Sequence, residues 1–242
     1  MTVPLFSVVI PAHNEQDFLP ACLRSITAAA GRIAEPVETI VVANRCTDET
    51  AAVAEVAGCR VVIDDSHTVA AVRNAGAAVA TGMMLITIDA DSTMHRDTFR
   101  EAKRRLLTGR FVGGAVRVLP ERSSPGIAVT MTMLNVALRF ARTGGGLYWC
   151  WRRDFRAIGG FDERLQIGED LDFAKRLRHH GRATDRSFVV LENIPIVTSC
   201  RKYDRFGDWF ALGLALRPGE ALASIRGSSR VFADRYLYDF NS

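Results

Sequence analysis

The sequence predicts an α/β fold, a doubly wound and mainly parallel β-sheet with helices on both faces. Apolar runs of strand length alternate with segments whose apolar residues recur at helical spacing. The connections between them are short, and such alternation favours parallel strands joined by covering helices. The 242 residues, of which 48% are hydrophobic, suffice for one large domain or two small ones with a buried core.

The first half of the chain contains four predicted strands with a helix between successive strands. Each strand is a short apolar run, and each helix ends where a glycine interrupts its pattern. The first strand is expected to stop before Pro11, because proline ends the run. The expected strands are 5–10, 38–43, 60–63 and 83–88, and the helix before the fourth strand is 69–80, which contains Arg73.

Two carboxylates follow the fourth strand. Asp89 and Asp91 are two residues apart, so on extended backbone their side chains point the same way. Open α/β sheets bind ligands at the carboxyl ends of their strands. Adjacent carboxylates repel each other unless a proton or cation lies between them, and a hard divalent ion that also holds a diphosphate would relieve that repulsion. The same pattern also suits a polar turn after a buried strand.

The two common nucleotide-binding fingerprints are absent from the sequence. No G-x-G-x-x-G follows a predicted strand, and no G-x-x-x-x-G-K-[ST] occurs. If phosphate is bound, a metal ion and basic side chains must therefore neutralise it, which gives more weight to Asp89 and Asp91.

The second half is expected to add helices at 95–107 and 123–142, a kinked strand at 111–119 and an aromatic strand at 147–151. Met131, Met133 and Leu134 form an apolar stripe on the second of these helices. Such a stripe is most often core, and a surface facing a membrane or an acceptor is the alternative.

Glu169 and Asp170 stand at the start of a further predicted helix, whose apolar face is marked by Leu171, Ala174 and Leu177. The helix dipole favours acids there by about 0.3–1 kcal/mol, which is a sufficient structural reason for acidic residues. It explains less well why the pair follows an aromatic strand and a Gly-Gly turn.

Composition narrows the range of partners. The net charge of +4 and the pI near 9.0 suit a phosphorylated ligand or an anionic membrane surface. No zinc-finger, RNP or arginine-rich signature appears, so no nucleic-acid partner is expected. Five scattered cysteines without a C-x-x-C indicate reduced thiols. We find no signal peptide or membrane span, so the expected location is cytoplasmic, either free or in peripheral contact with the inner face of a membrane.

The C-terminal part is the least informative. The stretch 208–216 has an apolar face that is expected to pack over the active site, with peripheral membrane contact or a homodimer face as alternatives. The stretch 231–240, rich in Tyr and Phe, is expected to be a docked tail.

Four separated stretches together resemble the family-2 glycosyltransferases, which have a GT-A type fold. The stretches are S-V-V-I-P-A-H-N-E at 7–15, T-I-V-V-A-N-R-C-T-D-E-T at 39–50, I-D-A-D-S at 88–92, and the segment 153–172 with its G-G-F-D and E-D. The resemblance covers roughly residues 5–181. It implies a nucleotide-sugar-binding half at 1–92, an acceptor-side half at 93–203, and a C-terminal helix and tail at 204–242.

The resemblance implies a metal-dependent, inverting transfer of a sugar from a nucleoside-diphosphate sugar to an acceptor hydroxyl on a saccharide, lipid or small molecule. Asp170 would be the general base, supported by Glu169. Asp91 would ligate Mn²⁺ or Mg²⁺, with Asp89 holding the ribose or a metal-bound water. Pro11, Asn14 and Glu15 would line the nucleotide pocket, and Arg73 would lie near the diphosphate or Asp89. The basic pair Arg201 and Lys202 resembles a late family segment that can reach the diphosphate.

The sequence departs from the family pattern in two places. Where an acidic residue often follows the second strand, this chain has Asn44, which offers both a donor and an acceptor to a base edge, so the usual uracil preference is in doubt. No Q-x-x-R-W follows the E-D pair, which argues against a processive polymer synthase. Two alternatives are a non-catalytic nucleotide-binding or scaffold module and a sugar nucleotidyltransferase, although the latter should have a glycine-rich first loop.

Overall fold

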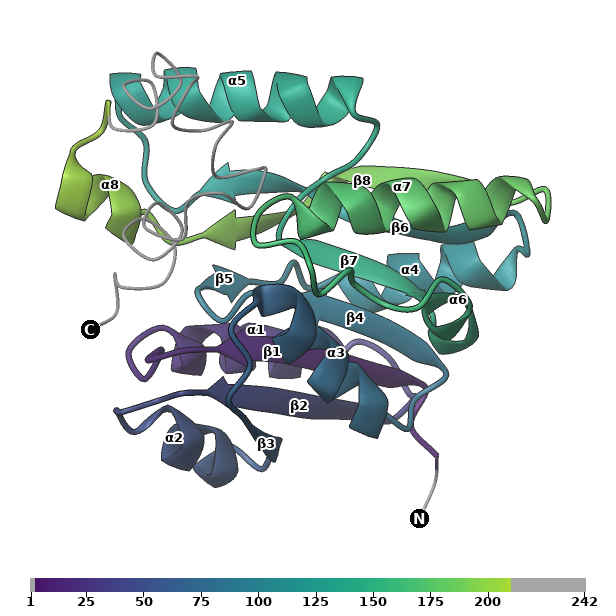
Figure 1. Ribbon diagram of the computed structural model, residues 1–242, viewed down its shortest axis with the longest axis horizontal. Helices are drawn as coiled ribbons and strands as arrows, with labels where there is room; N and C mark the ends of the chain where they lie inside the picture. Colours follow the sequence, from purple (N-terminus) through teal and green to yellow (C-terminus); the bar gives the residue numbers. More distant parts are fainter. Residues whose placement is uncertain (1–2, 210–242) are drawn as a thin grey trace.

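In the described part of the chain, a mixed sheet of eight strands lies at the centre (Figure 1). The structure, a computed structural model, describes residues 3–209. The strand order is β3-β2-β1-β4-β7-β6-β8-β5, and four of the seven pairings are parallel. The first-half strands are all parallel to one another: β1 (Phe6–Ala12), β2 (Val37–Asn44), β3 (Arg60–Asp64) and β4 (Met84–Ile88).

The second half extends this sheet with strands of mixed direction. Strand β7 (Leu147–Trp151) runs antiparallel to β4, and β6 (Phe111–Pro120) runs antiparallel to β7. Strand β8 (Ser187–Thr198) lies parallel to β6 and also pairs with the short β5 (Ser92–Thr93). The register of β6 against β8 shifts twice, once between Phe111 and Gly113, which agrees with the predicted kink.

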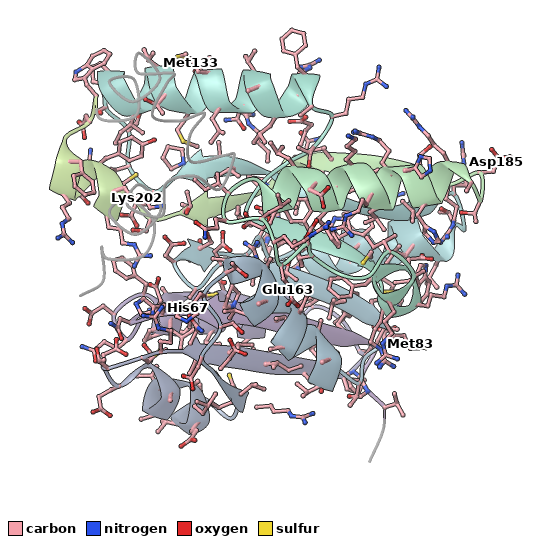
Figure 2. The ribbon with its side chains drawn as sticks, viewed as in Figure 1. His67, Met83, Met133, Glu163, Asp185 and Lys202 are labelled. Atoms are coloured by element: carbon pink, nitrogen blue, oxygen red, sulfur yellow. The ribbon has the colours of Figure 1, made fainter. Side chains whose placement is uncertain are left out.

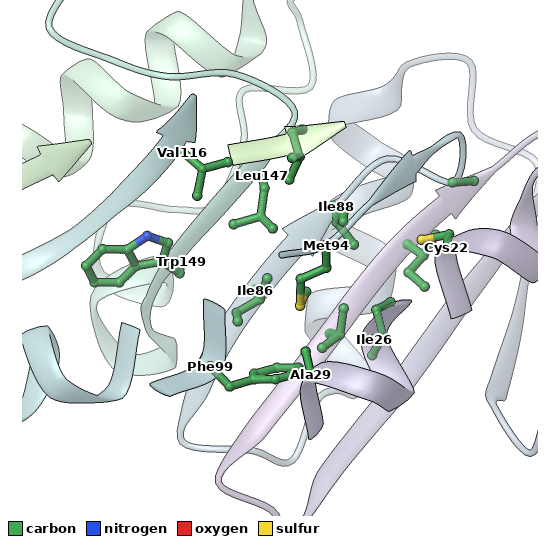
Figure 3. Close-up of a cluster of buried hydrophobic side chains, with 14 of the residues drawn as sticks. Cys22, Ile26, Ala29, Ile86, Ile88, Met94, Phe99, Val116, Leu147 and Trp149 are labelled. Atoms are coloured by element: carbon green, nitrogen blue, oxygen red, sulfur yellow. The ribbon is translucent and has the colours of Figure 1, made fainter. Parts of the chain in front are cut away.

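Helices cover both faces of the sheet because side chains alternate along its buried strands. On β1, Val8 and Ile10 belong to one core cluster, whereas Val9 belongs to the other. The first cluster packs under α1 (Leu19–Ala30), α2 (Thr50–Val56), α4 (Thr98–Leu107) and α5 (Pro125–Phe140), and Figure 3 shows part of it. The second packs under α3 (Val69–Val79), α6 (Arg152–Ala157) and α7 (Glu169–Arg182).

The predicted fold class is confirmed, with local corrections. Strand β1 continues through Pro11 to Ala12, because the proline lies at its end and pairs in register with Val42. The sequence reading did not identify β5, β8 or the final described helix, α8 (Arg201–Phe206). No helix within residues 3–209 is both long and apolar enough to cross a bilayer. The predictions for 231–240 and most of 208–216 concern residues outside this range.

The prediction that the methionine stripe of α5 is core is correct for only one of its residues. Met131 is buried, but Met133 and Leu134 are 50% and 41% exposed. The helix lies against β6, and Met133 points away from the sheet (Figure 2).

Candidate active site

A cavity of about 320 Å³ lies at the carboxyl ends of β1, β2 and β4, where the parallel strands end together. Its walls come from the loops after these strands, from the first turns of α3 and α7, and from the start of α8. It therefore brings together residues that are far apart in the sequence. The predicted residues that line it are Pro11, Glu15, Asn44, Arg73, Asp89, Asp91, Glu169, Asp170 and Arg201.

Arg73 on α3 connects the two acidic motifs. Its Nη2 donates to Asp89 Oδ1 at 2.7 Å, and its Nη1 donates to Asp170 Oδ1 at 2.8 Å and Glu169 Oε1 at 3.0 Å. The Arg73 side chain is only 4% exposed, and its guanidinium lies 5.1 Å from the ring centre of Phe161. One buried cation thus holds three carboxylates, with an aromatic ring of the Gly-Gly-Phe-Asp turn against it.

This arrangement shifts the ionisation of the site. Burial raises the pKa of Asp170 to about 7; the positive charge of Arg73 opposes that rise, while the negative charges of Glu169 and Asp89 add to it. Burial alone would lower the pKa of Arg73, but the three carboxylates outweigh it and keep the guanidinium protonated. Asp170 is therefore a carboxyl group that changes charge near neutral pH.

A second arginine closes the other side of the cavity. Arg201, the first residue of α8, donates to both carboxylate oxygens of Glu15, at 2.7 and 2.6 Å. Its Nη2 also lies 3.3 Å from Asp91 Oδ2, and its guanidinium lies 4.8 Å from the ring centre of Phe18. Burial raises the pKa of Asp91, and Arg201 opposes that rise. Glu15 and Asp91 thus share one cation, in a bidentate geometry on the Glu15 side.

Asp89 and Asp91 were predicted to be on extended backbone. The structure instead places them in the turn that follows β4. The Ser92 N–H donates to the carbonyl oxygen of Asp89 at 3.1 Å, and the Ser199 N–H donates to that of Asp91 at 3.0 Å. The turn, rather than strand alternation, directs both carboxylates to the cavity. Their expected proximity to one ligand site is therefore preserved for a different geometric reason.

Asn14 and Asn44 have structural tasks that the sequence did not reveal. Asn14, with φ of 51°, does not line the cavity; its Oδ1 accepts from the Thr47 N–H at 2.8 Å and so joins the loops after β1 and β2. Asn44 lines the cavity, but its amide nitrogen donates to the carbonyl oxygens of Asp64 and Ser66, each at 2.9 Å. The hydrogens of the Asn44 amide are therefore used within the protein, and the predicted hydrogen bond from this amide to a base edge is not available.

The sequence analysis did not identify the apolar residues that line the cavity. Val69 and Val72 on α3 form an apolar wall, and Lys202 follows Arg201 into the cavity. Burial lowers the pKa of Lys202, and the negative charge of Asp91 opposes this. Lys202 was expected beside Arg201, whereas the two valines are indistinguishable in sequence from core residues.

The donor atoms of the site fit an ion that takes only part of its ligands from the protein. Within residues 3–209 no three His, Cys, Asp or Glu side chains converge to hold a metal. Asp89 and Asp91 nevertheless both present carboxylate oxygens to the cavity. Mg²⁺ and similar hard ions are commonly held by one or two carboxylates, with substrate phosphates and water completing the shell. The site fits that mode of binding.

Two family models match this chain. The model described as glycosyl transferase family 2 matches residues 7–151, and the one described as N-terminal domain of galactosyltransferase matches residues 126–199. An uncharacterised glycosyltransferase of Mycobacterium bovis is 36% identical over 88 residues, which are 36% of this chain and 37% of the relative. This alignment therefore spans little more than a third of the relative's length.

Solved structures share the fold at low sequence identity. TarS 1–349 of S. aureus superposes with a TM-score of 0.63 and 18% identity, over 84% of this chain and 62% of that one. The glucosyl-3-phosphoglycerate synthase of Mycobacterium tuberculosis, in complex with Mn²⁺, UDP-glucose and phosphoglyceric acid, gives 0.57 and 22%, over 94% and 81%. Both comparisons show that this chain has the fold of those structures.

Proposed function

The chain belongs to glycosyltransferase family 2, and from that premise we propose that it moves a sugar from a nucleoside-diphosphate sugar to an acceptor hydroxyl. We further propose that the transfer is metal-dependent, inverts the anomeric carbon and adds one sugar per encounter. The observation that carries the proposal is the ion cluster in which Arg73 contacts Asp89, Glu169 and Asp170. It joins the donor-side and acceptor-side acids in one cavity.

On the donor side, we assign the nucleotide to the loops after β1 and β2 and the diphosphate to the basic end of the cavity. Pro11 and the α3 valines offer an apolar wall to a flat base, and Arg201 and Lys202 offer positive charge to phosphate oxygens. Asp91 and Asp89 would hold Mn²⁺ or Mg²⁺, which when bound offsets negative charge on the diphosphate leaving group. The Mn²⁺ and UDP-glucose in the M. tuberculosis synthase complex support this assignment.

On the acceptor side, we assign Asp170 as the general base. A sugar hydroxyl is a weak nucleophile, and a carboxylate with a pKa of about 7 can take its proton near neutral pH. Because Arg73 occupies Asp170 Oδ1, the other oxygen would receive the proton as the hydroxyl oxygen bonds to the anomeric carbon. The bond from that carbon to the diphosphate breaks on the opposite side, so the configuration inverts. Glu169 accepts from the same Arg73 Nη1 as Asp170 does and thereby helps to orient Asp170.

The proposal is tested by thermal unfolding with a panel of nucleoside diphosphates, with and without Mn²⁺, and by nucleoside-diphosphate release from the matching sugar donors. At about 100 times its Kd, a ligand should add about 2.7 kcal/mol of stability. This should raise Tm by roughly 5–10 °C for a chain of this size. Asp91→Ala should lose the Mn²⁺-dependent part of the increase.

The outcomes separate the possible functions. Stabilisation together with turnover supports the transferase. Stabilisation without turnover on any acceptor would instead support a non-catalytic nucleotide-binding module. No stabilisation by any nucleotide would contradict the donor site itself.

A further inference from the structure

Helix α5 is exposed, yet its side chains are mostly apolar. Arg139 is its one charged residue. Its polar Thr132 and Asn135 donate to carbonyl oxygens of the same helix, at 2.7 and 2.8 Å, rather than being directed only to water. Figure 2 shows Met133 pointing away from the sheet. The large apolar side chains that are at least 40% exposed on α5 are Val129, Met133, Leu134, Val136 and Phe140.

Four arginines are grouped at the carboxyl end of this helix. Arg139 and Arg142 come from α5 and the turn after it, and Arg178 and Arg182 come from α7. Arg178 Nη1 donates to the carbonyl oxygens of Ala141 and Arg142, at 2.9 and 3.1 Å, which brings the two helices together. Burial lowers the pKa of Arg178, and the positive charges of Arg182 and Arg142 lower it further.

Around the four arginines, positive charge exceeds negative charge in the described residues. In the described part of the chain none of them forms an ion pair, and from Arg122 through Arg153 the sequence contains no Asp or Glu. The groove beneath α5 contains Glu192, against Arg117, Arg139 and Arg142. The helix thus combines an outward apolar face with unneutralised positive charge.

We propose that the exposed face of α5 and these four arginines form a docking surface for a membrane that contains anionic lipids. An apolar helix face lies in the boundary between headgroups and acyl chains, and arginines beside it bind lipid phosphates. With 16 residues, α5 is too short to cross a bilayer, which needs about 20, so the helix lies in the plane of the surface. We name residues 129–142 of this face, with Arg178 and Arg182, the α5 surface.

Charge distinguishes this occupant from two others that could cover an apolar face. A second copy of the chain would bring the same four arginines to the contact. The segment 210–242 has more arginines than acidic residues, so it offers no net negative charge. An anionic bilayer supplies both the apolar phase and the negative charge that the α5 surface lacks.

The test is co-sedimentation of the full chain with vesicles of phosphatidylcholine alone and of phosphatidylcholine mixed with phosphatidylglycerol. We expect binding to the anionic vesicles that weakens as salt is raised, since exposed charges are screened. The variant Arg139→Gln/Arg142→Gln should reduce partitioning roughly 25-fold, at about fivefold per arginine. Met133→Ser/Phe140→Ser should reduce it about tenfold or more, because two apolar side chains leave the interface.

Matched controls make the same changes elsewhere on the surface. Arg24→Gln/Arg156→Gln removes two exposed arginines, and Val56→Ser/Leu107→Ser removes two exposed apolar side chains, and both variants should bind as the wild type does. Circular dichroism and light scattering without lipid establish that each variant is folded and has an unchanged oligomeric state. Equal binding to neutral and anionic vesicles, equal loss in the controls, or a lipid-free change of oligomeric state in Met133→Ser/Phe140→Ser would each overturn the proposal.

Discussion

Arg73 and Asp170 lie 97 positions apart in the sequence, and in the folded chain a 2.8 Å hydrogen bond joins them. The same guanidinium reaches Asp89 with its other amino group. The acid that begins α7 is therefore tied to the acid that follows β4 through one buried side chain. The expected behaviour of the site follows from this connection.

Replacing Asp170 by Asn should lower kcat by about 10²- to 10⁴-fold, the usual contribution of a positioned base, while nucleoside-diphosphate affinity stays within a few-fold of wild type. The measurement is steady-state kinetics together with calorimetric titration of the diphosphate. Asp172→Asn is the matched control, because Asp172 is in the same helical turn but pairs with Arg176 at 2.6 Å instead of lining the cavity. Full activity in Asp170→Asn would mean that another group removes the proton.

The pH dependence of activity should report the same carboxyl group. Since the pKa of Asp170 is raised to about 7, kcat/KM should fall about tenfold per unit as pH decreases below 7 and should level off above it. A flat profile from pH 5 to pH 8 would argue against this assignment.

Stability should change with pH in the opposite sense. The folded chain binds the Asp170 proton more tightly than the unfolded chain does, so this contribution is complete below about pH 4 and is lost as pH rises through 7. Urea unfolding of wild type and Asp170→Asn across this range should show the wild type losing stability relative to the variant. An unchanging difference between the two proteins would contradict the raised pKa.

Replacing Arg73 by Gln should destabilise the fold by about 3–5 kcal/mol, because three carboxylates would then face one another without a buried cation. Urea unfolding near neutral pH measures the effect. Arg164→Gln is the control: Arg164 is 89% exposed in its pair with Asp162, and exposed pairs contribute at most about 1 kcal/mol. Similar losses of unfolding free energy in the two variants would show that the Arg73 cluster stabilises the fold no more than an exposed ion pair does.

Glu15→Gln should weaken donor binding more than it slows the chemical step. Arg201 would lose its charged bidentate partner, and a lost charge-assisted bond typically costs about 1.5–3 kcal/mol, or roughly 10- to 100-fold in affinity. The donor KM should therefore rise while kcat changes little, and the exposed neighbour Asp17→Asn should behave as wild type. A fall in kcat at unchanged KM would instead assign Glu15 to the reacting centre.

Elements and acidic residues were predictable from the sequence where a local apolar pattern ends in chemically reactive side chains. The apolar run that ends at Asp89 predicted both a buried strand and acids at its carboxyl end, and Glu169 and Asp170 were identified at the start of a helix. The resemblance implied that Arg73 lies near Asp89 but not that it also contacts Glu169 and Asp170, because an arginine on an alanine-rich helix is normally solvent-exposed. In the folded chain Arg73 is buried, and its guanidinium lies against Phe161 of the Gly-Gly-Phe-Asp turn.

The sequence did not predict features that depend on partners remote in the chain. Asn14 and Asn44 were expected to contact the donor, and each also holds a neighbouring loop through hydrogen bonds that no local pattern encodes. Strand β8 was missed because Glu192, Asn193 and Pro195 interrupt its apolar pattern. The outward face of α5 was taken for core because periodicity does not say which apolar stripes find a partner.

The bidentate pair between Glu15 and Arg201 spans 186 positions of the chain. As the chain is synthesised, β1 to β4 and their helices emerge first and can assemble a parallel half-sheet from neighbouring segments. The wall that Arg201 supplies cannot form until β8 and the first turn of α8 have left the ribosome. The cavity is therefore completed late in biosynthesis, and a prematurely terminated chain would contain most of the sheet but lack the pair between Glu15 and Arg201.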